Sequence, residues 1–378
     1  MLAAMSDNLI VTAEQLDAFC QNIANSEWLA LDTEFLREKT YFSKLCLIQV
    51  YNGEHLGLID TLAIDDLEPL LTILDDEHVT KILHAAFQDL EIFCQLGKRV
   101  PAPIFDTQIA AALLGKGYQI SYGALVQELL DIELDKSHSR TDWSRRPLSD
   151  AQLSYAENDV LYLGDVYLKL KQALIDADKL HWLEEDDHLL SDPQQYQVDT
   201  SVVWQRVKGK EVLSRQQLAV LQALAAWREQ RAMRIDRPRR WVIADDALVA
   251  LAQTDGTTLP DDLPLNDKFL GKFAEQLIEL IRAALTLPES EWPELNLRPR
   301  PDKVEKATIK TLMQLVETTA LSVSVEPAML SNRKGLTALY HGTPGLPFLA
   351  GWRKTVIGDA LEAKLAEARA EAAAATDS

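Results

Sequence analysis

The chain has 378 residues, of which 47% are hydrophobic, and a formal net charge of −20, and at roughly 100–200 residues per domain it should form two or three domains. No apolar run approaches the ~18–20 residues that cross a bilayer, and the first residues lack the basic and hydrophobic segments of a secretory signal. We therefore expect neither membrane insertion nor secretion, and the three cysteines, widely spaced and without a C-x-x-C pair, favour a reduced, cytoplasmic setting over a disulfide framework or a zinc site.

The first ~115 residues should alternate between helices and strands. Thr12 and Gln15 have the spacing of a capping box, which opens a helix that runs to about Asn25. A short apolar run that ends in charge, WLALD, predicts a strand over 28–32. Further strands are expected over 45–51, 55–60, 80–84 and 104–106, and helices over 66–74 and 87–96.

From residue 107 to about 174 the pattern is helical, and Ser149 with Gln152 forms a second capping-box pair. Strands joined by a tight turn, followed by strands that alternate with helices, imply a mixed sheet covered by helices. We therefore expect an α/β domain over residues 1–200, which ends in a polar linker over 188–201.

Strand signals nearly vanish after Trp204. Helices are expected over 216–231, around 247, over 269–285 and over 306–321, and the proline-rich stretch 288–301 reads as a second linker. Positions 88 apart match faintly across that linker, which suggests a tandem repeat of one small helical domain. The expected architecture is therefore completed by two small all-α domains, over 205–291 and 300–372.

The charge is unevenly divided between the two halves. Residues 1–200 carry 14 Lys and Arg against 35 Asp and Glu, whereas residues 201–240 alone carry 10 against 3. An acidic body concentrates cations, and a locally basic segment could bind phosphates. Acidic surfaces are also common in ordinary soluble enzymes, so the asymmetry alone decides little.

Asp32-Thr33-Glu34, at the end of the first predicted apolar strand, is the strongest local signal. Residues i and i+2 of a strand point to the same face, so two carboxylates project side by side. Such close anions repel one another unless cations neutralise them. Oxygen ligands without Cys or a His cluster favour Mg²⁺ or Mn²⁺ over zinc. Taken alone, the pair fits a solvated strand end equally well.

Two weaker signals follow along the chain. Asp89 falls in the first turn of the helix after the strand that ends at His84, where an acid often only stabilises the helix dipole. Tyr155 and Asp159 are four residues apart on a predicted helix and therefore share a face. Each of these patterns, considered alone, is a frequent coincidence.

Together, these signals predict a carboxylate site for two metal ions. Four carboxylates, Asp32, Glu34, Asp89 and Asp159, can hold two divalent ions about 3.5–4 Å apart, which clamp the attacking and leaving oxygens of a phosphodiester. Because a free tyrosine has a pKa near 10, Tyr155 is better suited to orienting water than to acting as a base. The combination predicts metal-dependent phosphodiester hydrolysis.

These residues, in this order, resemble the DEDD exonuclease superfamily, and the Tyr155-x-x-x-Asp159 spacing resembles its tyrosine subclass. The stretches DTEFLRE, KLCLIQV, LHAAFQDLEIF, FDTQIAAALLG, WSRRPL and LSYAENDVLYL look like the bacterial ribonuclease D family, and this resemblance covers residues 20–175. The helical repeats resemble HRDC domains, with a good match over about 211–291 and a diverged copy over about 300–372.

The resemblance implies a ribonuclease H-like fold and hydrolysis of RNA from the 3′ end, with release of nucleoside 5′-monophosphates. It implies two divalent cations, Mg²⁺ or Mn²⁺, and substrates such as tRNA precursors and other structured RNAs with a single-stranded 3′ end. Asp32 would bridge both metals, Glu34 and Asp159 would hold the metal that activates water, and Asp89 would hold the second. Tyr155 would position the attacking water. No obligate protein partner is indicated.

Three candidates for substrate binding flank the ligands. Phe35 and Phe87 could stack on bases, a contact worth roughly 1–3 kcal/mol, although aromatic residues beside a sheet end more often belong to the core. His84 could touch the terminal nucleotide, but a strand-end histidine that bonds to the backbone fits as well.

The remaining candidates combine cations with an aromatic residue. Trp143 with Arg145 and Arg146 could hold phosphates, or Trp143 could simply anchor a loop. Arg228 and Arg231 share one helix face and begin an arginine-rich stretch that is the best candidate for a tRNA contact. A solvated charged face explains that stretch equally well.

Two other functions compete with RNA hydrolysis. A DNA-directed 3′–5′ exonuclease of the repair type would use the same carboxylates, and contacts to the 2′-OH, which the sequence does not place, would distinguish the two. A non-catalytic nucleic-acid-binding scaffold would be expected to have lost a ligand, and none is missing. The chain has no G-x-x-x-x-G-K-[ST] motif, which excludes a helicase role.

Overall fold

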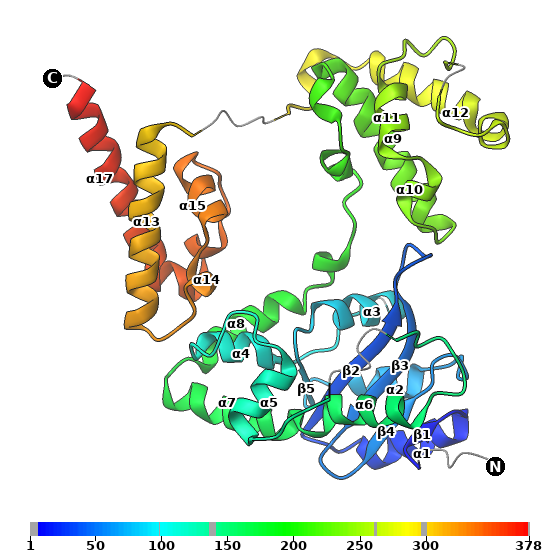
Figure 1. Ribbon diagram of the computed structural model, residues 1–378, viewed down its shortest axis with the longest axis vertical. Coiled ribbons are helices and arrows are strands. Elements are labelled where there is room, and N and C mark those ends of the chain that lie inside the picture. The colour runs from blue at the N-terminus through cyan, green and yellow to red at the C-terminus, as the bar shows by residue number, and fades with distance from the viewer. Residues whose placement is uncertain (1–6, 98, 136–140, 261–262, 296–300, 377–378) are drawn as a thin grey trace. The chain divides into compact units, whose positions relative to one another are not determined.

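The computed structural model describes residues 7–97, 99–135, 141–260, 263–295 and 301–376. The chain forms two compact units (Figure 1). The first contains residues 1–35, 45–196 and 300–378, and the second contains residues 36–44 and 197–299. Among the described residues, no helix combines the length and the apolar character that a bilayer crossing requires.

A six-stranded sheet forms the centre of the first unit, in the order β1-β4-β3-β2-β5-β6. The strands are β1 (Leu9–Ile10), β2 (Trp28–Leu36), β3 (Lys44–Tyr51), β4 (Leu56–Ile59), β5 (Thr80–Leu83) and β6 (Ile104–Asp106). β3 and β4 are antiparallel, whereas the β1–β4, β2–β5 and β5–β6 pairs are parallel. The predicted mixed sheet is therefore confirmed. The short strand β1 had no signal in the sequence patterns.

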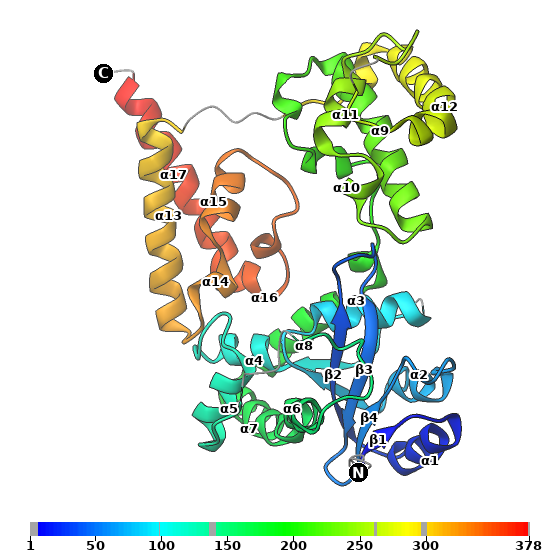
Figure 2. The same ribbon diagram turned by 45° about the vertical axis from the view of Figure 1, so that its right-hand side comes forward.

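Helices cover both faces of this sheet (Figure 2). Because side chains alternate along a strand, Leu29 and Leu31 of β2 pack into one core while Ala30 packs into the other. The first core includes residues of α1 (Ala13–Ile23), α2 (Glu68–Leu74) and α3 (Phe87–Gly97). The second includes residues of α4 (Thr107–Leu113), α5 (Tyr122–Leu130), α6 (Asp150–Leu161), α7 (Leu163–Asp176) and α8 (Leu180–Leu190).

Local signals at the helix ends agree with the sequence, with one exception. The capping boxes of Thr12 with Gln15 and of Ser149 with Gln152 are both formed. The predicted linker over 188–201 is wrong at its start, because α8 continues to Leu190 and a 3-10 turn covers Pro193–Tyr196. The Tyr196 hydroxyl donates to the carbonyl of Leu190, and both side chains pack against the core beside α3.

The C-terminal helices belong to the first unit and share the second of its cores. They are α13 (Lys303–Ser322), α14 (Pro327–Leu330), α15 (Arg333–Tyr340), α16 (Gly351–Arg353), a π-helical turn (Lys354–Gly358) and α17 (Asp359–Thr376). The indoles of Trp182 and Trp352 stack with centroids 4.4 Å apart and planes 6° apart. The Arg353 guanidinium binds both oxygens of Asp186, at 2.5 and 2.8 Å.

The second unit is helical apart from the segment 36–44. Its elements are 3-10 turns at Val203–Arg206, Lys210–Val212 and Glu289–Glu291, and the helices α9 (Arg215–Arg234), α10 (Arg239–Val242), α11 (Asp245–Ala252) and α12 (Asp267–Leu285). These helices enclose a separate apolar core. The predicted helix over 216–231 is longer at both ends, and a further capping box, formed by Ser214 and Gln217, sets its start.

Candidate metal centre

Three carboxylates converge just beyond the point where β2 and β5 pair. Asp32 and Glu34 lie on β2 and Asp159 lies on α6, and one oxygen of each is within 4.8 Å of the others. The pairing of β2 with β5 ends at Ala30, whereas β2 itself continues to Leu36. Asp32 and Glu34 therefore lie inside a longer strand than predicted, and alternation along it places them on one face.

Asp89, the fourth predicted ligand, lies in the first turn of α3 and is buried. Among the described residues it does not join the group of three, but its carboxylate accepts a hydrogen bond from the Thr33 hydroxyl. Thr33 lies between Asp32 and Glu34, so this bond ties the start of α3 to the catalytic strand. The sequence patterns gave no sign of this role for Thr33.

The turn that precedes α3 is held by a second carboxylate, Asp106. Its oxygens accept the backbone N–H groups of Ala85 at 3.1 Å and Ala86 at 2.8 Å. Ala85 has φ +59°, a conformation that non-glycine residues rarely adopt, and these bonds stabilise it. Asp106 also caps α4. An aspartate between a predicted strand and a predicted helix has the pattern of an N-cap, which could have identified it in the sequence.

Burial raises the pKa of every carboxylate in the centre, and repulsion by the neighbouring carboxylates adds to the shift for Asp32 and Glu34. Desolvation raises the pKa of Asp32 well above its ordinary value, and the charges of Asp159, Asp89 and Glu34 add to the shift. The same two causes raise the pKa of Glu34 to about 9. Burial raises the pKa of Asp89 and of Asp159 to about 7. Anions that close together need positive charge before they ionise at neutral pH.

The chemistry of these donors fits divalent cations. Carboxylate oxygens are hard ligands that suit Mg²⁺ and Mn²⁺, and no Cys or His belongs to the group of three. Divalent cations would supply the positive charge that lets the buried carboxylates ionise. The residues present therefore fit the metal ions that the sequence predicts.

Tyr155 precedes Asp159 by one turn of α6 and hydrogen bonds to it. Burial and the charges of Asp159, Glu34 and Asp32 raise the pKa of the Tyr155 hydroxyl far above its ordinary value. The phenol therefore stays protonated and can donate a hydrogen bond, as the sequence predicts, but it cannot serve as a base near neutral pH.

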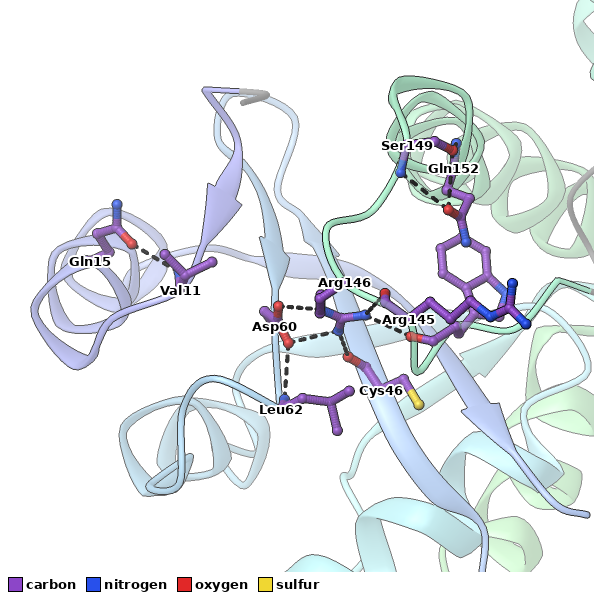
Figure 3. A network of polar contacts seen from close by, with 10 residues as sticks. Val11, Gln15, Cys46, Asp60, Leu62, Arg145, Arg146, Ser149 and Gln152 are labelled. Atoms are coloured by element: carbon purple, nitrogen blue, oxygen red, sulfur yellow. Dashed lines mark hydrogen bonds and ion pairs between the residues drawn. The ribbon is translucent and has the colours of Figure 1, made fainter. Parts of the chain in front are cut away.

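Tyr155 packs against a loop that Arg146 fastens to the sheet. The buried ring of Trp143 lies 6.1 Å from the Tyr155 ring, measured between centroids. Arg146 donates to both carboxylate oxygens of Asp60, at 2.5 and 2.7 Å, and to the carbonyl of Cys46 at 2.9 Å (Figure 3). Its remaining donors reach the carbonyls of Trp143, at 2.7 Å, and Arg145, at 2.9 Å.

Comparisons with known proteins agree with this geometry. A family model described as 3′–5′ exonuclease matches residues 8–175, and the HRDC domain model matches residues 217–263. The ribonuclease D of Jannaschia sp. is 39% identical over 362 residues, which cover 93% of this chain and 94% of that one. The ribonuclease D of Gluconacetobacter diazotrophicus is 37% identical over 93% of this chain and 91% of its own length.

The chain belongs to the ribonuclease D family of 3′–5′ exoribonucleases. A solved structure of Escherichia coli RNase D, described as an exoribonuclease involved in structured RNA processing, is 32% identical and superposes with a TM-score of 0.84. The superposition covers 96% of this chain and 99% of that one. The ribonuclease H-like exonuclease fold and the helical C-terminal half are thereby confirmed.

In this member of the ribonuclease D family, two of the predicted phosphate-binding arginines have other partners. Arg146 uses all five guanidinium donors within the protein, so it anchors a loop. Arg228 is 2% exposed and donates to Asp245 at 2.7 Å and to the carbonyl of Ile243 at 3.0 Å. Its burial and its partners within the second unit favour a structural role for Arg228, and its contact with RNA stays a prediction.

His84 has the backbone-bonded arrangement that the sequence left open. Its Nδ1 lies 2.9 Å from the Thr107 hydroxyl and its Nε2 lies 3.0 Å from the carbonyl of Ile120. Burial lowers the pKa of its imidazole. Since both nitrogens have protein partners, the predicted contact between His84 and the terminal nucleotide lacks a free ring nitrogen.

The other candidates differ in exposure. Phe87 is 48% exposed, beside Tyr196, and Phe35 is half-buried. Trp143 is buried, which agrees with the alternative that it anchors a loop. Arg145 is exposed and pairs with Asp142 at 3.2 Å. Arg231 is half-buried with its guanidinium 5.0 Å from the centre of the Phe273 ring. Substrate contacts by Phe35, Phe87, Arg145 and Arg231 remain predictions.

Proposed function

We propose that this exoribonuclease hydrolyses the 3′-terminal phosphodiester of RNA with two divalent cations and releases nucleoside 5′-monophosphates one at a time. The observation that carries the proposal is the convergence of the half-buried carboxylates of Asp32, Glu34 and Asp159, one oxygen of each lying within 4.8 Å of the others. Asp89, bonded to Thr33, supplies the fourth carboxylate. Mg²⁺ and Mn²⁺ both suit this donor set.

The proposed roles follow the resemblance to the DEDD exonucleases. Asp32 would contact both cations, Glu34 and Asp159 would hold the one near the attacking water, and Asp89 would hold the other. When bound, the cations lower the pKa of the attacking water and offset the charge that develops on the leaving oxygen. Tyr155 donates its hydroxyl proton toward Asp159 and would orient the water through the same oxygen. Trp143 holds the Tyr155 ring in place.

We further propose that the substrates are tRNA precursors and other structured RNAs that end in a single-stranded 3′ segment. The description of the Escherichia coli relative, which processes structured RNA, supports this choice. The three free thiols of Cys20, Cys46 and Cys94 support a cytoplasmic setting. We also propose the division into domains 1–200, 205–291 and 300–372, of which the last packs with the first.

A direct test follows short 5′-labelled single-stranded RNA and its DNA counterpart with the purified chain and Mg²⁺ or Mn²⁺. The RNA should shorten stepwise from the 3′ end, and EDTA or the Asp159→Asn substitution should abolish the shortening. Asp165→Asn, a matched change of an exposed aspartate on α7, should leave it intact. Faster degradation of DNA would favour the repair-type alternative. No degradation of either strand by the folded protein would leave only a binding role.

A further inference from the structure

The second unit contains a cleft of about 560 Å³ between the segment 36–44 and the helices around α10. We call it the basic cleft and define it by six of its lining residues, which are Arg37, Arg206, Lys208, Arg239, Arg240 and Trp241. All of its lining residues belong to the second unit. None of the carboxylates of the metal centre is among its lining residues.

Positive charge exceeds negative charge in this cleft. Arg206, Lys208 and Arg240 are exposed, and in the described part of the chain their side chains have no hydrogen bond or ion pair. The acidic lining residues are Glu38 and Asp245. Asp245 already pairs with Arg228 at 2.7 Å, so Arg228 compensates most of the charge of Asp245. The uncompensated cations suit a ligand that carries several spaced negative charges.

An exposed aromatic ring lies among these cations. Trp241 follows Arg240 on α10, lines the cleft and is 62% exposed. A tryptophan that exposed loses the benefit of burial unless a ligand covers it. Aromatic rings beside cations are the pattern with which proteins bind single-stranded nucleic acids, because bases stack on the ring while the cations contact phosphates.

Hydrogen bonds hold both walls of the cleft together. The Asp236 carboxylate accepts the backbone N–H groups of Tyr41 at 2.9 Å and Phe42 at 3.0 Å. The Tyr41 hydroxyl donates to Glu229 at 2.5 Å, and Glu229 also pairs with Arg239 at 3.1 Å. The cleft therefore has a defined shape before any ligand binds, which lowers the entropic cost of binding.

We propose that the basic cleft binds the sugar–phosphate backbone of single-stranded RNA, with Arg206, Lys208 and Arg240 at phosphates and Trp241 stacked on a base. The choice of RNA rests on the proposed function. The charge and the exposed ring are independent of it. Arg228 also lines the cleft but is buried and paired with Asp245, so the proposal places the phosphate contacts on its exposed neighbours.

The test measures binding without cleavage. The full chain with Asp159→Asn is titrated into a labelled single-stranded RNA of about 15 nucleotides, and fluorescence anisotropy is followed over a salt series. Arg206→Gln, Lys208→Gln and Arg240→Gln should each weaken binding and each lower the slope of log K against log salt by about 0.7. Lys268→Gln, which removes an exposed lysine of α12 outside the cleft, should change neither quantity.

The ring is tested separately. Trp241→Ala should weaken RNA binding by about 5-fold or more, since base stacking on an aromatic residue contributes ~1–3 kcal/mol. Trp241→Phe keeps an aromatic ring and should retain most of the affinity. Thermal unfolding checks that each variant is folded. Unchanged affinity and salt slope in the folded cleft variants would overturn the proposal, as would stronger displacement of the RNA by an acidic polypeptide than by unlabelled RNA. Because no cleavage is measured, failure here is distinct from failure of the proposed hydrolysis.

Discussion

Arg146 and Asp60 form a doubly hydrogen-bonded ion pair, at 2.5 and 2.7 Å, that fastens the Trp143 loop to the end of β4. The carboxylate of Asp60 is nearly fully buried, and the guanidinium has no free donor. The loop in turn places the Trp143 ring against Tyr155. The pair therefore supports the metal centre through two packed rings, those of Trp143 and Tyr155.

Breaking this pair should lower activity through Tyr155. Arg146→Lys retains the charge but cannot supply a planar fork of five donors, so we expect a lower kcat with KM little changed. Asp60→Asn should also destabilise the fold, because removing one partner of a buried ion pair costs roughly 3–5 kcal/mol. Steady-state kinetics and denaturant unfolding measure the two effects. Arg99→Lys, which changes an exposed arginine paired with Glu68 and Asp75, is the control, and an equal loss there would contradict the assignment.

Removing only the hydroxyl of Tyr155 should separate its proposed role in orienting the attacking water from the packing of its ring against Trp143. Tyr155→Phe keeps the ring against Trp143 but loses the hydrogen bond to Asp159. We expect kcat to fall by about 10²-fold, the scale on which a small misplacement of reacting groups acts, with thermal stability unchanged. Because the pKa of Tyr155 is raised far above its ordinary value, the parent enzyme should lose no activity between about pH 7 and 9 through ionisation of this residue. A loss that Tyr155→Phe removes would show that Tyr155 titrates.

The metal-free protein should become less stable as pH rises. The folded-state pKa values of about 9 for Glu34 and about 7 for Asp89 and Asp159 lie above the ordinary values near 4. The folded state therefore binds more protons than the unfolded state, and its advantage, full below about pH 4, is lost as pH rises through those values. In EDTA, Tm should be lower at about pH 8 than at about pH 5.

Two comparisons isolate the contribution of the metal centre to that trend. Asp159→Asn removes one titrating group, so its Tm in EDTA should depend less on pH than that of the parent. Saturating Mg²⁺ or Mn²⁺ should raise the Tm of the parent more at about pH 8 than at about pH 6, because at the lower pH protons must leave before the metal binds. Identical pH profiles for parent and variant would contradict the raised pKa values.

Arg228→Gln should act on stability and not on RNA contacts. The guanidinium is buried and pairs with Asp245, so its loss leaves a carboxylate uncompensated and should cost roughly 3–5 kcal/mol in the second unit. Urea unfolding of the full chain should then show an early transition. A folded, equally stable variant with weaker RNA binding would instead support the original prediction for this residue.

The sequence predicted the convergence of Asp32, Glu34 and Asp159 because the signals that place them are local. Asp32 and Glu34 alternate along one strand, and Tyr155 and Asp159 lie one turn apart on one helix, as the sequence patterns predict. The hydrogen bond from Thr33 to Asp89 and the ion pair of Asp60 with Arg146 join residues 56 and 86 positions apart. Neither periodicity nor composition encodes such long-range partners.

The arginines also show that the sequence does not encode tertiary partners. A charge run gives the number of cations but not which of them face the core, and Arg228 turned inward because Asp245 could pair with it there. The packing of the C-terminal helices on α8 also had no local signal, since it depends on Asp186 and Arg353, 167 positions apart. Tertiary contacts decided each of these cases.

The face-to-face indoles of Trp182 and Trp352 supply an intrinsic optical reporter. Two stacked, nearly parallel chromophores with centroids 4.4 Å apart interact electronically, so their near-ultraviolet circular dichroism and emission differ from those of separate tryptophans. The signal exists only while α16 is seated against α8. A spectrometer can therefore follow the docking of the C-terminal helices in unlabelled protein, during refolding or while RNA is being degraded.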